Sequence, residues 1–390
     1  MNIETFGINK TGDLVPISGI PSASHAFVPY PIPPQIEFSQ GVYRLSTEAQ
    51  VALARLDGMG EILPNPLLLL KPLQRREAKL SLQLEGTITQ PDQLLLFEKE
   101  EIEASNGTDV NAYRETSNYA RALDYAIHQT ELPISLRLIR QLHEILLTGV
   151  RGQEYTPGEF RREQNQIDHP PRYVPPPPNY LLGCLDNLEK YIHIDRVFDP
   201  LIDSFILHYQ FEAIHPFRDG NGRVGRLLLA IVIMNWCGLN NLWLYLSPYF
   251  NLYRSEYMDL LLNVSKNGEW EEWLSFCLKG VITQAKDTKA RIRLLLSIER
   301  NFKDRVDEIG GGKRLYWIIE NLFYNPIITI PDIINHFQVS DPTARSDIKK
   351  LVDTEILVEG PRLKSRTRAF LSVEIMNAIY RDIPENAYGQ

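Results

Sequence analysis

The stretch His215-Pro216-Phe217-Arg218-Asp219-Gly220-Asn221-Gly222-Arg223-Val224-Gly225-Arg226 separates two apolar segments and decides the fold of the centre of the chain. Before it, Asp199-Pro200 is typical of a helix N-cap followed by a first-turn proline, and apolar residues then recur at helical spacing. After it, Arg223 to Trp236 is largely apolar and ends near Gly238. The sequence therefore predicts two buried helices joined by a short glycine-containing loop.

Outward from this centre, apolar residues recur at intervals of three and four, which predicts a mainly α bundle. Residues 156–174 lose this period and indicate a small β-hairpin, and Pro175 to Pro178 favours a rigid connector over a ligand for a proline-binding module. The first 45 or so residues, rich in Pro, Ser and Gly, predict an extended arm. The other expected helices are Thr47 to Leu56, Leu67 to Leu84, Tyr113 to Gln129, Ser135 to Thr148, Asn179 to His193, Tyr253 to Val264 and Trp270 to Ile298.

The C-terminal region has the order of a winged helix-turn-helix, a small α/β domain. Three predicted helices (Lys313 to Tyr324, Ile330 to Phe337, Pro342 to Asp353) precede two predicted strands (Ile356 to Val358 and Ala369 to Ser372). Basic residues suit phosphate contacts, but acidic residues slightly outnumber them between Asn301 and Gln390, so DNA, a docking protein and a second copy of the chain all stay open as partners. These basic residues are Arg345, Lys349, Lys350, Arg362, Lys364, Arg366 and Arg368.

Composition bounds the class of protein. The chain has 390 residues, 44% hydrophobic residues and a net charge of −8, which is ordinary for a globular protein and argues against a dedicated nucleic-acid coat protein. Three distant cysteines (Cys184, Cys237, Cys277) suit a reducing compartment. No signal peptide or membrane-spanning run is evident, so we expect a cytoplasmic protein without a membrane partner.

The central loop has the composition of a polyphosphate site. A helix N-terminus presents free N–H groups and a positive dipole, and Gly220 and Gly222 let a ligand approach the backbone. Arg223 and Arg226 add two guanidinium groups on one side. Asp219, an acid amid this positive charge, suits Mg²⁺ bridging the phosphates. His215 can be neutral near pH 7 and accept a proton from a hydroxyl.

Two other readings of the histidines and glycines are weaker. Gly220, Gly222 and Gly225 satisfy G-x-G-x-x-G, but the preceding segment is helical and no acid lies at the ribose-binding offset, which excludes a dinucleotide fingerprint. His143 has no second histidine four residues on, so the sequence favours a structural role for it, as for His208.

The central stretch resembles the full signature of the Fic (filamentation induced by cAMP) family, His-x-Phe-x-Asp/Glu-Gly-Asn-Gly-Arg-x-x-Arg. The resemblance implies a protein adenylyltransferase with ATP as substrate and Mg²⁺ as cofactor. It makes His215 the base and Asp219 the metal ligand. It also implies a nucleotide and phosphate site formed by Gly220, Asn221, Gly222, Arg223, Val224, Gly225 and Arg226, with Asn251 and Tyr257 near the adenine.

Two further segments are similar to Fic elements. Phe160 to Ile167 resembles the flap that docks the target segment, with Asn165, Gln166 and Ile167 at its centre. Ser81-Leu82-Gln83-Leu84-Glu85-Gly86 matches the inhibitory pattern Ser/Thr-x-x-x-Glu-Gly/Asn, which implies that Ser81 and Glu85 restrain Arg226. The implied organisation is an N-terminal region with the inhibitory helix (1–110), a Fic core (111–285), a helical linker and hinge (286–312) and a winged helix domain (313–390).

The resulting hypothesis is transfer of AMP to a hydroxyl of an unidentified target protein or of the chain itself, restrained by Glu85. Two alternatives stay open at this point. One is a DNA-binding regulator whose Fic core senses nucleotides with little turnover. The other is transfer of a different phosphate-containing group, or removal of AMP, at the same site.

Overall fold

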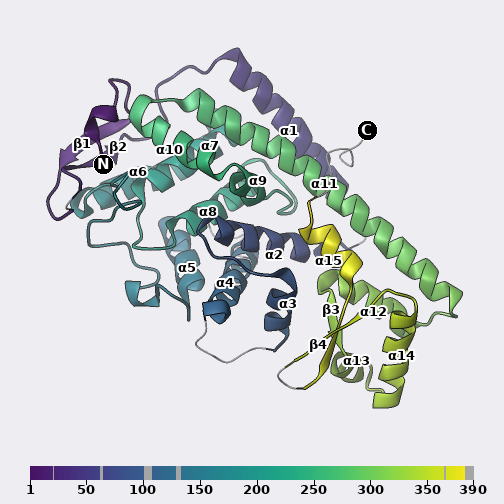
Figure 1. Cartoon of the computed structure of the whole chain (residues 1–390). Coiled ribbons are helices and arrows are strands. Elements are labelled where there is room, and N and C mark those ends of the chain that lie inside the picture. The colour runs from purple at the N-terminus through teal and green to yellow at the C-terminus, as the bar shows by residue number, and fades with distance from the viewer. Residues whose placement is uncertain (21, 62–64, 101–107, 129–132, 364–365, 383–390) are drawn as a thin grey trace. The chain divides into compact units, whose positions relative to one another are not determined.

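The chain forms two compact units that interlace in the sequence. A computed structural model describes residues 1–20, 22–61, 65–100, 108–128, 133–363 and 366–382 (Figure 1). The first unit contains 1–57, 80–86 and 118–285, and the second contains 58–79, 87–117 and 286–390. Among the described elements, four helices contribute residues to both units, namely α1 (Gln40–Glu61), α2 (Leu67–Leu84), α4 (Thr108–His128) and α11 (Trp270–Glu308).

The first unit is built around α7 (Pro200–Ile214) and α8 (Asn221–Trp236), which pack along each other. Both helices are apolar on nearly all sides and are buried, as such helices must be. The Asp199 carboxylate caps α7 by accepting the Leu201 N–H at 2.9 Å. The remaining helices wholly within this unit are α5 (Leu136–Leu147), α6 (Pro178–His193), α9 (Ser247–Leu252) and α10 (Arg254–Asn267).

The N-terminal arm is extended, as predicted, and its strands pair with each other. β1 (Gly12–Pro16) and β2 (His25–Pro29) form an antiparallel hairpin after the short 3₁₀ turn η1 (Ile3–Thr5). The Phe27 N–H donates to the Val174 carbonyl at 2.8 Å, and the Phe27 side chain is buried. The arm therefore belongs to the core of the first unit.

The predicted β-hairpin in residues 156–174 is reduced to a single bridge between Ile167 and Tyr173, after the 3₁₀ turn η2 (Gln153–Tyr155). Side chains replace the missing ladder, because the Gln164 amide donates to the Pro175 carbonyl at 2.8 Å. The Asn165 amide likewise donates to the Phe217 and Arg218 carbonyls at 3.3 and 3.2 Å. Polar side chains and not strand pairing thus hold this segment.

The second unit contains the predicted winged helix-turn-helix. Its helices α12 (Lys313–Tyr324), α13 (Ile330–Phe337) and α14 (Asp341–Asp353) confirm the expected ranges, and a capping box of Thr329 and Asp332 begins α13. The sheet order is β3-β5-β4, and β4 lies two residues later than expected. Its other elements are α3 (Pro91–Glu100), α15 (Val373–Tyr380), β3 (Ile327–Thr329), β4 (Val358–Arg362) and β5 (Arg368–Leu371), of which α3, α15 and β3 were not predicted.

Three of the six described basic residues that the sequence singled out in the winged region pair with nearby acids. On α14, Arg345 pairs with Asp341 and Lys349 pairs with Asp353, each one helical turn away. In the wing, Arg368 pairs with Glu359, and Lys364 lies outside the described residues. These pairs reduce the positive charge that the sequence alone suggested. No helix in the described ranges is long and apolar enough to cross a membrane.

A buried guanidinium group joins α11 to α15 in the second unit. Arg291 donates to both oxygens of Asp287 at 2.8 and 3.0 Å. It also donates to the main-chain carbonyls of Ala378, Ile379 and Arg381 at 2.8–3.0 Å, which satisfies the C-terminal end of α15. Within the expected helical linker and hinge, residues 286–312, α11 continues as helix to Glu308 and ends before Gly310.

We expect Arg291→Met to lower the free energy of unfolding of this unit by about 3–5 kcal/mol, because it leaves the buried carbonyls at the end of α15 without their donor and leaves Asp287 with the weaker Arg76 contact at 3.3 Å. Arg293→Met, at an exposed position two residues on, is the matched control and should be near neutral. Urea unfolding followed by circular dichroism measures the difference. Equal midpoints for the two variants would contradict the assignment.

Candidate active site

His215 lies at the C-cap of α7 in the left-handed backbone region (φ 49°, ψ 61°), which turns the chain out of the helix. Its Nδ1 lies 3.3 Å from the Glu212 carbonyl, which can only accept, so Nδ1 carries the hydrogen. Nε2 then holds the lone pair needed by a base. Burial lowers the pKa of His215 to about 4, and the nearby Arg161 charge acts in the same direction. The imidazole is therefore neutral at pH 7.

Arg161 holds the main chain around His215 and is a functional residue that the sequence reasoning missed. Its Nε donates to the His215 carbonyl at 2.9 Å, and its Nη2 donates to the carbonyls of Pro176 at 2.6 Å and Ile214 at 3.3 Å. The Arg161 main-chain N–H donates to the Pro216 carbonyl at 2.9 Å. The residue is 7% exposed, and these carbonyls at the negative end of α7 stabilise its charge. No sequence motif marks this role.

The loop after His215 turns sharply into α8. Gly220 is the N-cap of α8 with φ 77°, a conformation that favours glycine. The Asn221 side chain accepts the Phe217 N–H and donates to the Phe217 carbonyl, both at 2.8 Å. The Asp219 carboxylate accepts the Gly220 N–H at 2.7 Å and lies 3.4 Å from Arg223. The loop is therefore held by its own side chains, with the N-terminus of α8 at the cavity.

Arg226 is bound by the end of α2. Its guanidinium donates to the Ser81 hydroxyl at 2.8 Å, to the Ser81 carbonyl at 2.9 Å and to Glu85 Oε1 at 2.8 Å. Arg226 is 4% exposed, whereas the Glu85 side chain is 43% exposed. Burial alone raises the pKa of Glu85, but the Arg226 charge and hydrogen bond outweigh it and hold that pKa below its ordinary value. Glu85 is thus a carboxylate at neutral pH.

The Glu85 carboxylate lies over the glycine loop. A Cβ atom on Gly222 would collide with Glu85 Oε1, so the glycine leaves the space that the carboxylate occupies. Arg254, missed by the sequence reasoning, donates from Nε to the Leu84 carbonyl at 2.9 Å and holds the last turn of α2. The Glu85 carboxylate therefore occupies the position at which the sequence predicted a bound phosphate group.

These residues surround one cavity of about 350 Å³ in the first unit. Tyr173, Tyr209 and Ser265 lie in its wall beyond the loop, and none of them was predicted. Arg223, Val224, Gly225, Asn251 and Ser81 are not in the wall; Ser81 instead contacts Arg226 from behind. The predicted residues that do form the wall are Glu85, Asn165, Gln166, Ile167, His215, Asp219, Gly220, Asn221, Gly222, Arg226 and Tyr257.

Glu212, one turn before His215, also lines the cavity and was missed. Burial raises its pKa to about 7, although the Arg226 charge acts in the opposite direction. Its Oε1 has no hydrogen-bond partner among the described atoms and lies where a Cβ on Gly225 would be. Glu212 is one of two acids in α7, together with Asp203, and an acid within so apolar a helix was the signal that could have found it.

Comparisons with known proteins identify two domains in the sequence. Residues 43–128 match the Fic/DOC family N-terminal domain, and residues 133–233 match the Fic/DOC family domain. The chain therefore carries a Fic/DOC N-terminal domain followed by a Fic/DOC domain. The Fic domain ends within α8, so it contains His215, Asp219 and Arg226, and Glu85 lies in the preceding N-terminal domain.

Two curated relatives share the Fic region. The chain is 31% identical to the probable protein adenylyltransferase aq_aa38 of Aquifex aeolicus over 164 residues, which are 42% of this chain and 49% of that protein. It is 32% identical to the protein adenylyltransferase Fic of Drosophila grimshawi over 135 residues, which are 34% of this chain and 27% of that protein. The matches therefore span less than half of the length of each relative.

Two solved Fic structures share the fold. A Fic family protein from Desulfovibrio desulfuricans G20 has a TM-score of 0.57 at 19% identity and covers 88% of this chain and 99% of its own. Fic-1 (residues 134–508) from C. elegans has a TM-score of 0.51 at 18% identity and covers 65% and 74%. The mainly helical Fic fold expected from the sequence is confirmed.

We expect Arg161→Gln to raise the pKa of His215, because removing a buried positive charge stabilises the imidazolium. Glu85 and Asp219, the carboxylates that act on His215, raise its pKa and are unchanged in this variant. NMR titration of ¹³C-histidine-labelled protein measures the midpoint, with the His215 signal identified by its loss in His215→Ala.

The matched control for this titration is Arg162→Gln, whose guanidinium is 86% exposed and pairs with Glu159. It should leave the His215 midpoint near pH 4. An equal shift in both variants, or none in Arg161→Gln, would refute the influence of Arg161 on His215.

Proposed function

We propose that the protein transfers AMP from ATP to a hydroxyl group of a target protein. The observation that carries this proposal is the meeting, in one cavity, of a neutral histidine, a carboxylate, a helix N-terminus and a buried arginine. This set suits an activated hydroxyl and a polyphosphate together. The naming of the relatives as protein adenylyltransferases supports the choice of AMP.

In this proposal the target hydroxyl attacks the α-phosphorus in line, and His215 Nε2 takes the hydroxyl proton as the new P–O bond forms. The bond from the α-phosphorus to the bridging oxygen breaks, and pyrophosphate leaves. The N–H groups at the start of α8 and the Arg226 guanidinium stabilise the phosphate oxygens. Catalysis then consists of proton transfer, positioning and charge neutralisation.

The residues fit Mg²⁺ held mainly by the nucleotide. Asp219 is a carboxylate at the cavity, and no group of three or more His, Cys, Asp or Glu side chains in the described ranges could form a metal cage of its own. Mg²⁺ usually takes one or two carboxylates together with phosphate oxygens and water. Bound there, it would neutralise charge on the leaving pyrophosphate, and Asp219 would hold it.

We further propose that Glu85 restrains this activity. Its carboxylate accepts a hydrogen bond from the Arg226 guanidinium and occupies the space next to Gly222. A phosphate group would need both that guanidinium and that space. Ser81 and Arg254 keep the end of α2 in place. ATP then binds in a pose that His215 cannot use, until a signal or partner moves the end of α2.

Glu85→Gly should increase AMP transfer, including onto the protein itself, by about 5–150-fold, the usual range of an allosteric coupling free energy. His215→Ala in that background should lower it by at least about 100-fold, because the base is lost. Incorporation of label from α-³²P-ATP with Mg²⁺ measures both effects.

Gln83→Gly is the matched control for Glu85→Gly, because it adds a glycine to the same end of α2 without touching Arg226. It should behave like the wild-type protein. Equal labelling by Glu85→Gly and wild type would refute restraint by Glu85. Label from γ-³²P-ATP alone would indicate phosphoryl transfer, and loss of label from a pre-labelled protein would indicate AMP removal.

We propose that the winged helix contacts a protein and not DNA. Arg345 and Lys349 of α14 are each paired with an acid of the same helix, which lowers the positive potential that DNA binding requires.

The full chain should therefore fail to shift duplex DNA in an electrophoretic assay at low salt. The double variant Asp341→Asn/Asp353→Asn removes the masking charges and should bind DNA more tightly than wild type. A shift of duplex DNA by the wild-type chain would contradict the proposal, and equal binding by wild type and the double variant would contradict the masking by Asp341 and Asp353.

A further inference from the structure

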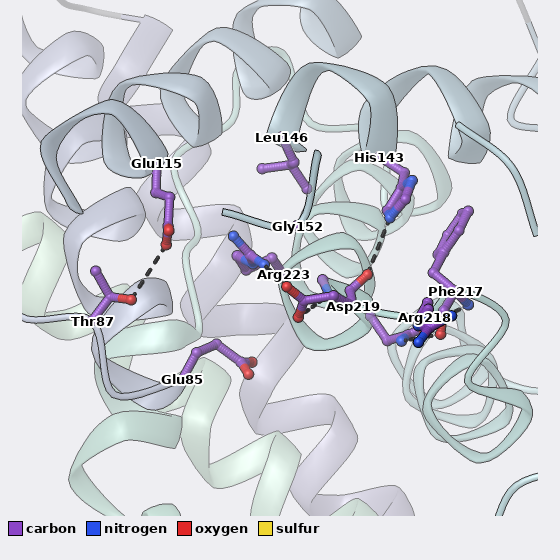
Figure 2. Close-up of polar contacts among 12 residues, drawn as sticks. Glu85, Thr87, Glu115, His143, Leu146, Gly152, Phe217, Arg218, Asp219 and Arg223 are labelled. Carbon is purple, nitrogen blue, oxygen red and sulfur yellow. Dashed lines mark hydrogen bonds and ion pairs between the residues drawn. The ribbon is translucent and has the colours of Figure 1, made fainter. Parts of the chain in front are cut away.

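His143 of α5 is fully buried. Figure 2 shows its ring near Phe217 and its hydrogen bond to Asp219 in the motif loop. The His143 Nδ1 lies 2.8 Å from the main-chain nitrogen of Gly158, two residues before the flap. Its Nε2 lies 3.1 Å from the Asp219 main-chain carbonyl. The ring stacks on Phe217, with centroids 3.8 Å apart and planes inclined by 5°. One side chain thus contacts both the segment that leads into the flap and the motif loop.

The chemistry of the two partners sets the tautomer of His143. A main-chain N–H only donates, so Nδ1 must accept from Gly158. A main-chain carbonyl only accepts, so Nε2 must carry the hydrogen and donate to Asp219. The neutral Nε2–H form satisfies both partners, and no other form does. The two ring nitrogens therefore link the Gly158 N–H to the Asp219 carbonyl through two hydrogen bonds of fixed direction.

The Asp219 carboxylate depends on its own main chain for its direction. It accepts the Gly220 N–H at 2.7 Å, within the turn that His143 holds through the Asp219 carbonyl. On the flap side, Gly158 has φ 81°, and its carbonyl accepts from Arg140 Nε at 2.6 Å. Both segments are thereby fixed to the same helix, α5.

We propose that His143 is a positioning residue. It fixes the Asp219 loop and the segment at Gly158, which leads into the flap, relative to each other. This inference rests on the proposed function in its kinetic consequences only. It extends the structural role suggested by the sequence, because a merely structural histidine would affect folding and not the direction of Asp219. Outer residues that orient ligands typically change metal affinity or activity by about 10–100-fold when replaced.

Two isosteric variants separate the two contacts. In His143→Gln the amide nitrogen can take the place of Nε2 and donate to Asp219, but the acceptor for Gly158 is lost. In His143→Asn the amide oxygen can take the place of Nδ1 and accept from Gly158, but the side chain is too short to reach Asp219. Ile139→Ala, a buried change on the same helix, is the control for simple destabilisation.

Hydrogen exchange followed by mass spectrometry tests the geometry without any catalysis. His143→Gln should exchange faster at residues 156–163, and His143→Asn should exchange faster at residues 215–222. Ile139→Ala should not speed exchange in one of these two segments while leaving the other unchanged. Identical exchange profiles for the Gln and Asn variants would overturn the proposal.

AMP transfer in the Glu85→Gly background gives the second measurement. We expect His143→Asn to raise the Mg²⁺ concentration for half-maximal rate by about tenfold or more, and His143→Gln to leave it nearly unchanged. Equal Mg²⁺ dependence of the two variants would also overturn the proposal. If the Glu85→Gly parent transfers no AMP, the proposed function fails, and the exchange pattern alone decides the role of His143.

Discussion

The loop between α7 and α8 places main-chain polar groups inside the protein, and the active site depends on how those groups find partners. Arg161 donates hydrogen bonds to the carbonyls at the end of α7. Asn221 bonds both the N–H and the carbonyl of Phe217, and His143 donates a hydrogen bond to the Asp219 carbonyl. A buried carbonyl or N–H without a partner costs as much as a lost hydrogen bond. The side chains that meet this requirement are also those that orient the base and the carboxylate.

The charges of the site are distributed unevenly over this frame. Burial keeps His215 neutral and the Arg161 charge acts in the same direction. Among the described residues Arg161 donates to carbonyls, whereas Arg226 has a carboxylate partner in Glu85. A guanidinium that already holds a carboxylate has no free face for a phosphate in the same geometry. Glu85 and the nucleotide would therefore compete for Arg226, because both present negative oxygens to the same guanidinium. They would also need the same volume, which stays open because Gly222 has no side chain.

Several features of the fold were predictable because their signal is local. Helices α2, α12 and α13 have the predicted bounds, since their apolar period and end signals lie within the segment itself. The flap was predicted less well, because its conformation depends on Gln164 and Asn165 finding carbonyls 11 and 52 residues away. Helix α15 was missed although it is as long as α13, which has a capping box at its start that α15 lacks. Helix α3 was also missed.

The sequence by itself indicated the Fic domain, the helical character, and the candidate residues His215, Asp219 and Arg226, because these follow from residue type and short spacing. It also placed Glu85 next to Arg226 through a short motif. Tertiary structure alone decided the contacts of Arg161, Glu212 and His143, and placed Val224 and Asn251 outside the cavity wall. Those placements depend on side chains that meet across as many as 76 residues, as His143 and Asp219 do, or on which face of a helix points inward. Packing determines such contacts, and no local pattern encodes them.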